Sequence, residues 1–190
     1  MNQQVRNETD FILAGSFKQL VLEKPVEKIT IKDITDRSGV IRPTFYNHFQ
    51  DKYELLEWII TSELLEPMQP LVKAGMITEA VVLLFTNMEK ERAFYTRLHK
   101  MDGPISFHEI ANRCVEETLN GIFEELASMN KKENKNPLIR PRLLAKYYAN
   151  AMNLIAEDWI DAGMTISPRD MGEAFNLMIT SSMEDLVNQL

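Results

Sequence analysis

Polar side chains suited to contacting a DNA duplex are concentrated in one short segment, residues 42–48. They are Arg42, Thr44, Tyr46, Asn47 and His48. Arg42 and Asn47 can form hydrogen bonds with the edges of purine bases in a major groove. The hydroxyl groups of Thr44 and Tyr46 can bond to phosphate oxygens, and such bonds position a protein on the duplex without reading its sequence. The segment therefore predicts contact with double-stranded DNA.

Lys52 extends this polar set into the next expected helix. Asp51 can cap that helix, and Glu54 three residues later completes a capping box. Lys52 then lies in the first turn, where an ammonium group and unpaired backbone N–H groups can bind one phosphate together. We therefore expect Lys52 to bind a phosphate of the DNA backbone.

Two short helices around a tight turn can hold residues 42–48 in a major groove. The first helix is expected to begin at Thr30, whose hydroxyl can cap it, and to end at Gly39. Gly39 can adopt the positive φ that the turn demands. The second helix is expected over residues 42–49, and apolar residues set its angle to the first. They are Ile34, Val40, Phe45 and Phe49. This arrangement is a helix-turn-helix, whose second helix enters the major groove.

The same stretch resembles the TetR family of bacterial transcriptional regulators, most specifically over residues 9–60. The resemblance is carried by Thr30-Ile31-Lys32-Asp33-Ile34, Ser38-Gly39-Val40, Thr44-Phe45-Tyr46-Asn47-His48-Phe49, Lys52 and Leu55-Leu56. Within the family, the run from Arg42 to Ile59 is most similar to regulators associated with dihydroxyacetone kinase genes. Regulators of that kind include activators as well as repressors.

The resemblance implies a set of DNA-contacting residues. They are Thr30, Arg42, Thr44, Tyr46, His48 and Lys52, with Pro43 at a position that often touches a thymine methyl group or a sugar. The chain departs from the family pattern at Ile41, where a capping residue such as serine is usual. Loss of such a cap costs roughly 1 kcal/mol, so we expect the second helix to be poorly ordered without DNA.

The helical spacing of apolar residues along most of the chain predicts an all-α fold with two parts. Residues 1–50 would form the helix-turn-helix DNA-binding domain. Residues 51–190 would form a helical regulatory and dimerisation domain.

Prolines and polar runs set the expected ends of the later helices. Pro67 and Pro70 would end the helix that starts after residue 51, because proline cannot continue a helical hydrogen-bond ladder. A polar run over residues 130–137 is expected to be a linker. The last two helices are expected at about residues 141–162 and 168–189.

Both of these last helices carry apolar stripes at helical spacing. One stripe includes Leu143, Tyr147 and Leu154, and the other includes Phe175 and Met178. A chain of this size cannot bury every such stripe alone, so a homodimer through the last two helices is expected. In the TetR family these helices pair with their symmetry mates as a four-helix bundle. Two helix-turn-helix motifs can then match two half-sites.

Several residues between positions 78 and 130 are candidates for lining an effector pocket. They are Phe94, Tyr95, His99, Phe107, Cys114 and Phe123. The alternative, that each is an ordinary core residue, stays open at this point. Members of the TetR family commonly bind a small molecule in this part of the chain. The resemblance therefore implies control by a small-molecule effector or by a protein partner.

The charge of the chain limits how strongly it can bind nucleic acid. The net charge is −7, and the first 57 residues hold eight basic and nine acidic side chains, so the DNA-binding part is near neutral. This balance favours modest non-specific affinity. It keeps open an alternative function, a protein-interaction adaptor of the same fold that binds DNA weakly.

No residue pattern in the sequence indicates catalysis, cofactor binding or insertion into a membrane. The three histidines lack metal-ligand spacing, the single Cys114 cannot complete a zinc site, and the glycines form no phosphate-binding loop. No apolar run approaches the roughly 20 residues of a membrane span, and the N-terminus lacks the apolar segment of a secretory signal. We therefore expect a cytoplasmic protein that is not an enzyme and needs no cofactor.

Overall fold

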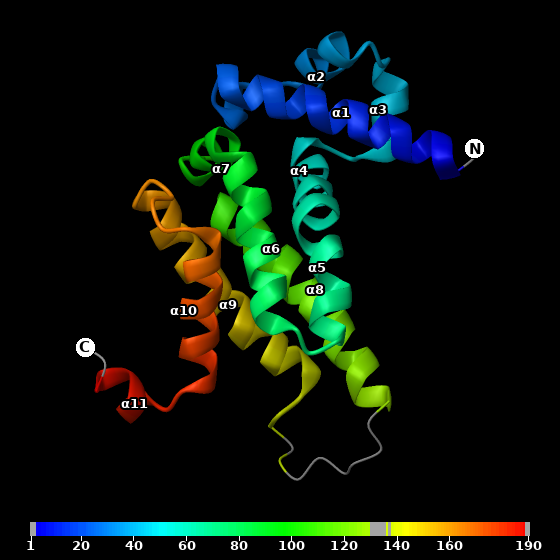
Figure 1. Ribbon diagram of the computed structural model, residues 1–190. Helices are drawn as coiled ribbons and strands as arrows, with labels where there is room; N and C mark the ends of the chain where they lie inside the picture. Colours follow the sequence, from blue (N-terminus) through cyan, green and yellow to red (C-terminus); the bar gives the residue numbers. More distant parts are fainter. Residues whose placement is uncertain (1–2, 130–135, 137, 189–190) are drawn as a thin grey trace.

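The structure is a computed structural model that describes residues 3–129, 136 and 138–188, and all its regular elements in these ranges are helical (Figure 1). The first elements are α1 (Gln3–Glu23), a 3-10 turn η1 (Val26–Lys28), α2 (Ile31–Ser38), α3 (Arg42–His48) and α4 (Lys52–Ile60). A π-helical turn η2 (Thr61–Leu65) leads into α5 (Glu66–Lys73). The later helices are α6 (Ile77–Lys90), α7 (Arg92–His99), α8 (Phe107–Met129), α9 (Pro141–Asp161), α10 (Pro168–Thr180) and α11 (Met183–Val187). The all-α prediction is confirmed.

The helix-turn-helix forms from α2 and α3 where the sequence predicts it. Thr30 and Asp33 cap the start of α2 reciprocally, and α2 ends at Gly39, whose φ is 70°. The helix α3 begins after Ile41, which offers no side-chain cap. Phe45 is fully buried and packs α3 onto the core beneath it. In Figure 1 the long α1 lies across this end of the molecule beside α2 and α3, and α4 leads away from it.

The helix that begins at Lys52 does not end at Pro67 and Pro70, so that expectation is wrong. The π-helical turn η2 lies immediately before the prolines, and the N–H of Glu66 bonds to the carbonyl of Thr61. Because Pro67 then falls in the first turn of α5, its missing N–H removes no hydrogen bond from a helix interior. The result is one long helical rod from α4 to α5.

The rest of the chain forms a helical body around this rod. α8 packs against α9, and both α5 and α10 pack against α6. Figure 1 shows α10 along the outer side of α6, away from α5. Gly172 allows α10 to come close, because a Cβ there would lie 2.4 Å from Val82 Cγ2. The expected linker at 130–137 lies outside the described residues except for Asn136.

The final helix is shorter than expected. α10 ends at Thr180, and Ser181 has an extended backbone with φ −90° and ψ 152°. Ser182 then starts the separate helix α11 with a capping box to Asp185. Adjacent serines favour such a break, since their hydroxyls bond to nearby backbone groups and compete with the helical ladder.

Candidate nucleic-acid interface and regulatory cavity

The solvent-facing side of α3 carries most of the residues expected to contact DNA. Arg42, Pro43, Tyr46 and Asn47 are exposed, and Thr44 is half-buried. Within the part of the chain that the structure describes, Arg42 makes no ion pair, so its guanidinium is available to a ligand. The face therefore presents one free cation together with hydroxyl and amide groups.

Thr30 is exposed at the start of α2, but its hydroxyl already has partners. The Asp33 N–H donates to Thr30 Oγ1 at 3.1 Å, and Thr30 Oγ1 donates to Asp33 Oδ2 at 2.7 Å. Lys24 binds the same carboxylate at 2.8 Å and, with these hydrogen bonds, holds the pKa of Asp33 well below its usual range. A phosphate near Thr30 would therefore meet the first turn of α2 rather than a free hydroxyl.

His48 lies on the inner side of α3, and this corrects the expectation that it contacts DNA. Its side chain has no exposed surface, and its Nδ1 lies 2.6 Å from Asp10 Oδ1 of α1. A buried carboxylate costs much free energy unless a hydrogen bond compensates for its lost hydration. His48 therefore serves to pair Asp10 and to fix α3 against α1.

Lys52 also has a different role from the one expected. Its Nζ donates to three backbone carbonyl oxygens, those of Val26 at 2.7 Å, Glu27 at 3.1 Å and Ile29 at 2.9 Å. An ammonium group has three donors, so this arrangement uses all of them. Partial burial lowers the pKa of Lys52. The residue joins the start of α4 to the connection between α1 and α2, and it holds no free proton for a phosphate.

Polar contacts link the DNA-binding end to the helical body. Lys18 of α1 binds Glu63 of η2 at 2.9 Å and Glu91, at the junction of α6 and α7, at 3.1 Å. The backbone N–H of Asp102, between α7 and α8, donates to Glu27 Oε1 at 3.0 Å. These contacts connect η2 and the α7–α8 connection to α1 and to the turn before α2.

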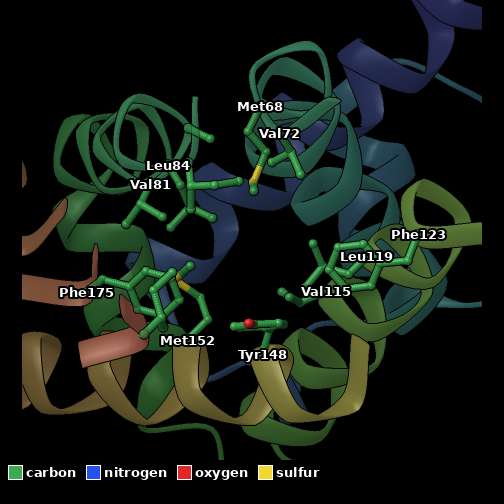
Figure 2. Close-up of a pocket in the computed structure, with 13 residues that line it drawn as sticks. Met68, Val72, Val81, Leu84, Val115, Leu119, Phe123, Tyr148, Met152 and Phe175 are labelled. Carbon is green, nitrogen blue, oxygen red and sulfur yellow. The ribbon is translucent and has the colours of Figure 1, made fainter. Parts of the chain in front are cut away.

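A cavity of about 200 Å³ lies inside the helical body (Figure 2). Its walls come from α5, α6, α8, α9 and α10. The lining residues are Met68, Val72, Ile77, Ala80, Val81, Leu84, Val115, Leu119, Phe123, Tyr148, Met152, Phe175 and Ile179. Of the residues expected to line an effector pocket, only Phe123 is among them.

The other residues expected to line an effector pocket lie elsewhere and do not border this cavity. Phe94 and Tyr95 have 1% exposure and belong to the packed core. Phe107 borders a much smaller void of about 30 Å³. His99 Nε2 lies 2.9 Å from the carboxylate of Asp161 near the surface. Cys114 is buried, and burial raises the pKa of its thiol to about 11.

The missed lining residues are mostly aliphatic side chains at ordinary helical spacing, and Tyr148 and Phe175 are the aromatic ones among them. Val115, Leu119 and Phe123 recur every four residues on α8, which predicts an inward face. Periodicity shows that a side chain points inward. It does not show whether that side chain packs against another side chain or borders a cavity. No signal in the sequence separates these residues from the core.

Two family models match the chain. The model of bacterial regulatory proteins of the TetR family matches residues 13–59, and a TetR model of the transcriptional regulator C-terminal region matches residues 76–181, more than half of the chain. The chain belongs to the TetR family. TetR-family proteins are transcriptional regulators with a helix-turn-helix domain, so the expectation that this chain is not an enzyme is confirmed. Among the described residues, no helix is long and apolar enough to cross a membrane.

Known TetR-family proteins show where the similarity is greatest. The chain is 29% identical over 94 residues to DhaS, the HTH-type transcriptional activator of the dhaKLM operon in Lactococcus lactis, and the match spans half of each protein. This likeness confirms the narrower resemblance to dihydroxyacetone kinase regulators.

Solved structures share the fold over nearly the whole chain. One is the dihydroxyacetone kinase operon activator DhaS, with a TM-score of 0.61 and 23% identity over 90% of this chain and 94% of that one. Another is NalD of Pseudomonas aeruginosa, the secondary repressor of the MexAB-OprM multidrug efflux pump. It has a TM-score of 0.58 and 22% identity over 89% of this chain and 93% of that one.

Proposed function

We propose that this TetR-family chain is a homodimeric regulator that binds an operator through the exposed face of α3. The observation that carries the proposal is the position of Arg42, Tyr46 and Asn47 on the solvent side of a helix whose inner side is fixed by Phe45 and His48. A rigid inner side sets the orientation in which the outer groups enter a groove. Such a regulator acts in the cytoplasm, where the DNA is.

The proposed contacts form two groups. Arg42 and Asn47 would read base edges, while Thr44, Tyr46 and the first turn of α2 at Thr30 would bind phosphates. Pro43 would contact a thymine methyl group or a sugar. His48 is left out of the contact set because its side chain is buried, and Lys52 because its ammonium group donates to three backbone carbonyl oxygens.

The proposed dimer uses the outer sides of the last two long helices. Leu143, Tyr147 and Leu154 of α9 are 53%, 63% and 61% exposed, and they follow one side of the helix. Leu177 and Met178 of α10 are 40% and 44% exposed. An apolar surface of this kind is stabilised when a second copy covers it. A twofold axis would place two α3 helices on half-sites roughly 34–36 Å apart, or a multiple of that spacing.

Control is proposed to act through the helical body, by a small molecule in the cavity or by a protein partner. An occupant that prefers one arrangement of the two α3 helices shifts the population between DNA-binding and non-binding forms. Whether binding activates or represses depends on where the operator lies relative to the promoter. DhaS is named an activator and NalD a repressor, and they share this fold.

Titration of operator DNA selected from a random library tests the contact set. Arg42→Ala should weaken binding by about 5- to 150-fold and relax the choice of one base pair, because a bidentate base contact is worth about 1–3 kcal/mol. Tyr46→Phe should weaken binding to all sequences to a similar extent. Arg169→Ala, which removes a charge from the exposed surface of α10, should change nothing. If Arg42→Ala and Tyr46→Phe bind like the parent protein, the contact set is wrong.

A second candidate function is an adaptor that binds a protein and only weakly binds DNA. It is favoured by the ion pairs near the helix-turn-helix, where Lys24, Lys32 and Arg37 are all paired with carboxylates. Salt dependence separates the two functions, because log K falls by about 0.9 per log unit of salt for each phosphate neutralised. A flat salt response would favour the adaptor.

A further inference from the structure

We propose that the cavity between α5, α6, α8, α9 and α10 binds a compact, neutral, apolar molecule with one hydrogen-bonding group, which Tyr148 holds. This inference rests on the proposed function, in which the cavity is one route of control. It adds the chemical class of the ligand and the residue that orients it.

The size of the cavity limits the ligand to a small molecule. The volume is about 200 Å³. An engineered apolar cavity of about 150 Å³ stays dry and binds benzene, so this space suits a ring with a short substituent or a short branched chain. Met68 and Met152 lie in its walls, and their flexible thioethers can adjust to a ligand's outline.

The chemistry of the walls excludes a charged ligand. None of the described residues that line the cavity is acidic or basic, and Tyr148 carries their only side-chain oxygen or nitrogen. An ion moved from water into such a site loses its hydration and gains no opposite charge, which is far costlier than moving a neutral group. A carboxylate or ammonium compound should therefore bind much more weakly than its neutral analogue.

Tyr148 is placed to meet the ligand's polar group. Figure 2 shows its side chain extending from α9 to the cavity, opposite Met68 and Val72. Its ring makes an edge contact with Phe123, with centroids 6.1 Å apart and planes at 66°. Within the described residues its hydroxyl makes no hydrogen bond. A phenol can donate to a carbonyl or ether and accept from a hydroxyl, so one uncharged oxygen on the ligand satisfies it.

The cavity is connected to the DNA-binding end by the α4–α5 rod. Met68 and Val72 lie on α5, which is continuous through η2 with α4. Asn87 of α6 donates to the Glu63 carbonyl of η2 at 3.3 Å, and Lys52 at the other end of α4 holds the turn before α2. π-helical turns interrupt the regular ladder and are frequent at functional sites. A ligand that moves α5 would therefore move α4 and the helix-turn-helix.

Paired probes that differ only in charge test the ligand class. We expect 2-phenylethanol, cyclohexylmethanol and 1-hexanol to raise the unfolding temperature of the full chain, because a ligand that binds only the folded state stabilises it. Phenylacetate and hexanoate at the same concentration and pH 7.5 should not. If the carboxylates bind as well as the alcohols, or if no neutral probe binds at millimolar concentration, the proposal is overturned.

Calorimetric titration of the variants locates the site. Tyr148→Phe should weaken the binding of 2-phenylethanol by about fivefold, the loss expected for one hydrogen bond of about 1 kcal/mol. Tyr53→Phe is the matched control, since Tyr53 lies in the first turn of α4 and does not line the cavity, so it should leave affinity unchanged. Leu119→Trp should fill the cavity and abolish binding. Unchanged binding in Leu119→Trp, in a variant with the parent's circular dichroism, would place the ligand elsewhere and overturn the proposal.

DNA binding is measured separately on the same samples, so that the two proposals can fail independently. Probe binding that follows Tyr148 and Leu119 supports the ligand class even if no DNA is bound, and in that case the operator-binding function fails. Operator binding without any probe binding overturns the ligand class alone. A change in operator affinity on adding 2-phenylethanol, lost in Leu119→Trp, supports both.

Discussion

His48 and Lys52 carry the chemical groups that a DNA contact requires, yet both side chains are directed into the protein. His48 Nδ1 pairs with the buried carboxylate of Asp10 on α1. Lys52 donates to three carbonyl oxygens in the connection between α1 and α2. Their neighbours Tyr46 and Asn47 remain exposed. Within this segment, the direction of each side chain from its helix decides whether it can meet DNA or instead holds the helix in place.

The role of Lys52 can be tested by removing its charge while keeping its length. Lys52→Met removes the ammonium donor from the carbonyl oxygens of Val26, Glu27 and Ile29, so it should lower the free energy of unfolding by about 2 kcal/mol. Lys32→Met is the control, because Lys32 is exposed and pairs only with Asp36 one turn away. Urea denaturation measures both. Equal stability of Lys52→Met and the parent protein would show that these hydrogen bonds are not stabilising.

The buried thiol of Cys114 should make stability depend on alkaline pH. Burial raises the pKa of Cys114 to about 11, because the thiolate loses its hydration. The folded state therefore holds this proton more tightly than the unfolded state, and its contribution to stability is lost as pH rises from the ordinary thiol range towards 11. Cys114→Ala should lack this component in urea denaturation from pH 8 to 11.

The same shift predicts a slow reaction of Cys114 with a disulfide reagent. Only the thiolate is nucleophilic, so the folded protein at pH 8 should react far more slowly than the protein in concentrated urea. Absorbance of the released thiolate follows the reaction. Rapid labelling of the folded protein would contradict the burial of this residue.

At the scale of elements, hydrogen bonds and close contacts between helices set where helices continue and where they stop. In the α4–α5 rod, η2 changes the ladder just before Pro67, and Pro70 lies inside α5. The close contact of α10 with α6 depends on Gly172, which also brings Phe175 and Ile179 to the cavity. The cavity wall on this side thus depends on one small residue.

Paired glycine substitutions test the contact between α6 and α10. In Gly172→Ala the new Cβ would lie 2.4 Å from Val82 Cγ2 and 3.2 Å from the Thr78 carbonyl oxygen. Valine has little rotamer freedom in a helix, so α10 must shift, and we expect a loss of about 1–3 kcal/mol. Gly121→Ala on α8 meets nothing within 4 Å and should raise stability by about 0.5–1 kcal/mol through helix propensity. Thermal unfolding of both variants measures the difference, and a stabilised Gly172→Ala would exclude the tight contact.

In the whole molecule, the proposed dimer makes α9 a link between the cavity and the distance that separates the two α3 helices. α9 contributes to both, since Tyr148 and Met152 face the cavity while Tyr147 and Leu154 are exposed on its other side. A ligand that shifts α9 can therefore alter the dimer geometry as well as the α4–α5 rod.

A charge placed on the outer side of α9 tests the dimer. Leu154→Glu should yield a folded monomer, because the residue is 61% exposed in the single chain but would be buried between two copies. Light scattering after size exclusion gives the mass. Operator affinity should fall too, since two half-sites are no longer bound together. Leu22→Glu, on an exposed site of α1, should remain dimeric; a dimeric Leu154→Glu would place the interface elsewhere.

Features that depend on near neighbours along the chain could be predicted from the amino-acid sequence. The cap at Thr30, the turn at Gly39 and the exposure of Arg42, Tyr46 and Asn47 on α3 all follow from residues within a few positions of one another. The motif that carries the family resemblance is of the same kind. Backbone hydrogen bonds and helical periodicity act over one or two turns, so they can be inferred from local sequence.

Which polar groups are free and where a cavity remains depend on contacts between distant parts of the chain, and these became visible in the folded protein. The partner of His48 lies 38 residues away, and those of Lys52 lie 23 to 26 residues away. The cavity needs five helices to enclose it, and its mostly aliphatic lining has the same periodicity as a packed core. Helical periodicity places a side chain on the inward face, but whether it meets an atom or a void depends on how distant helices pack.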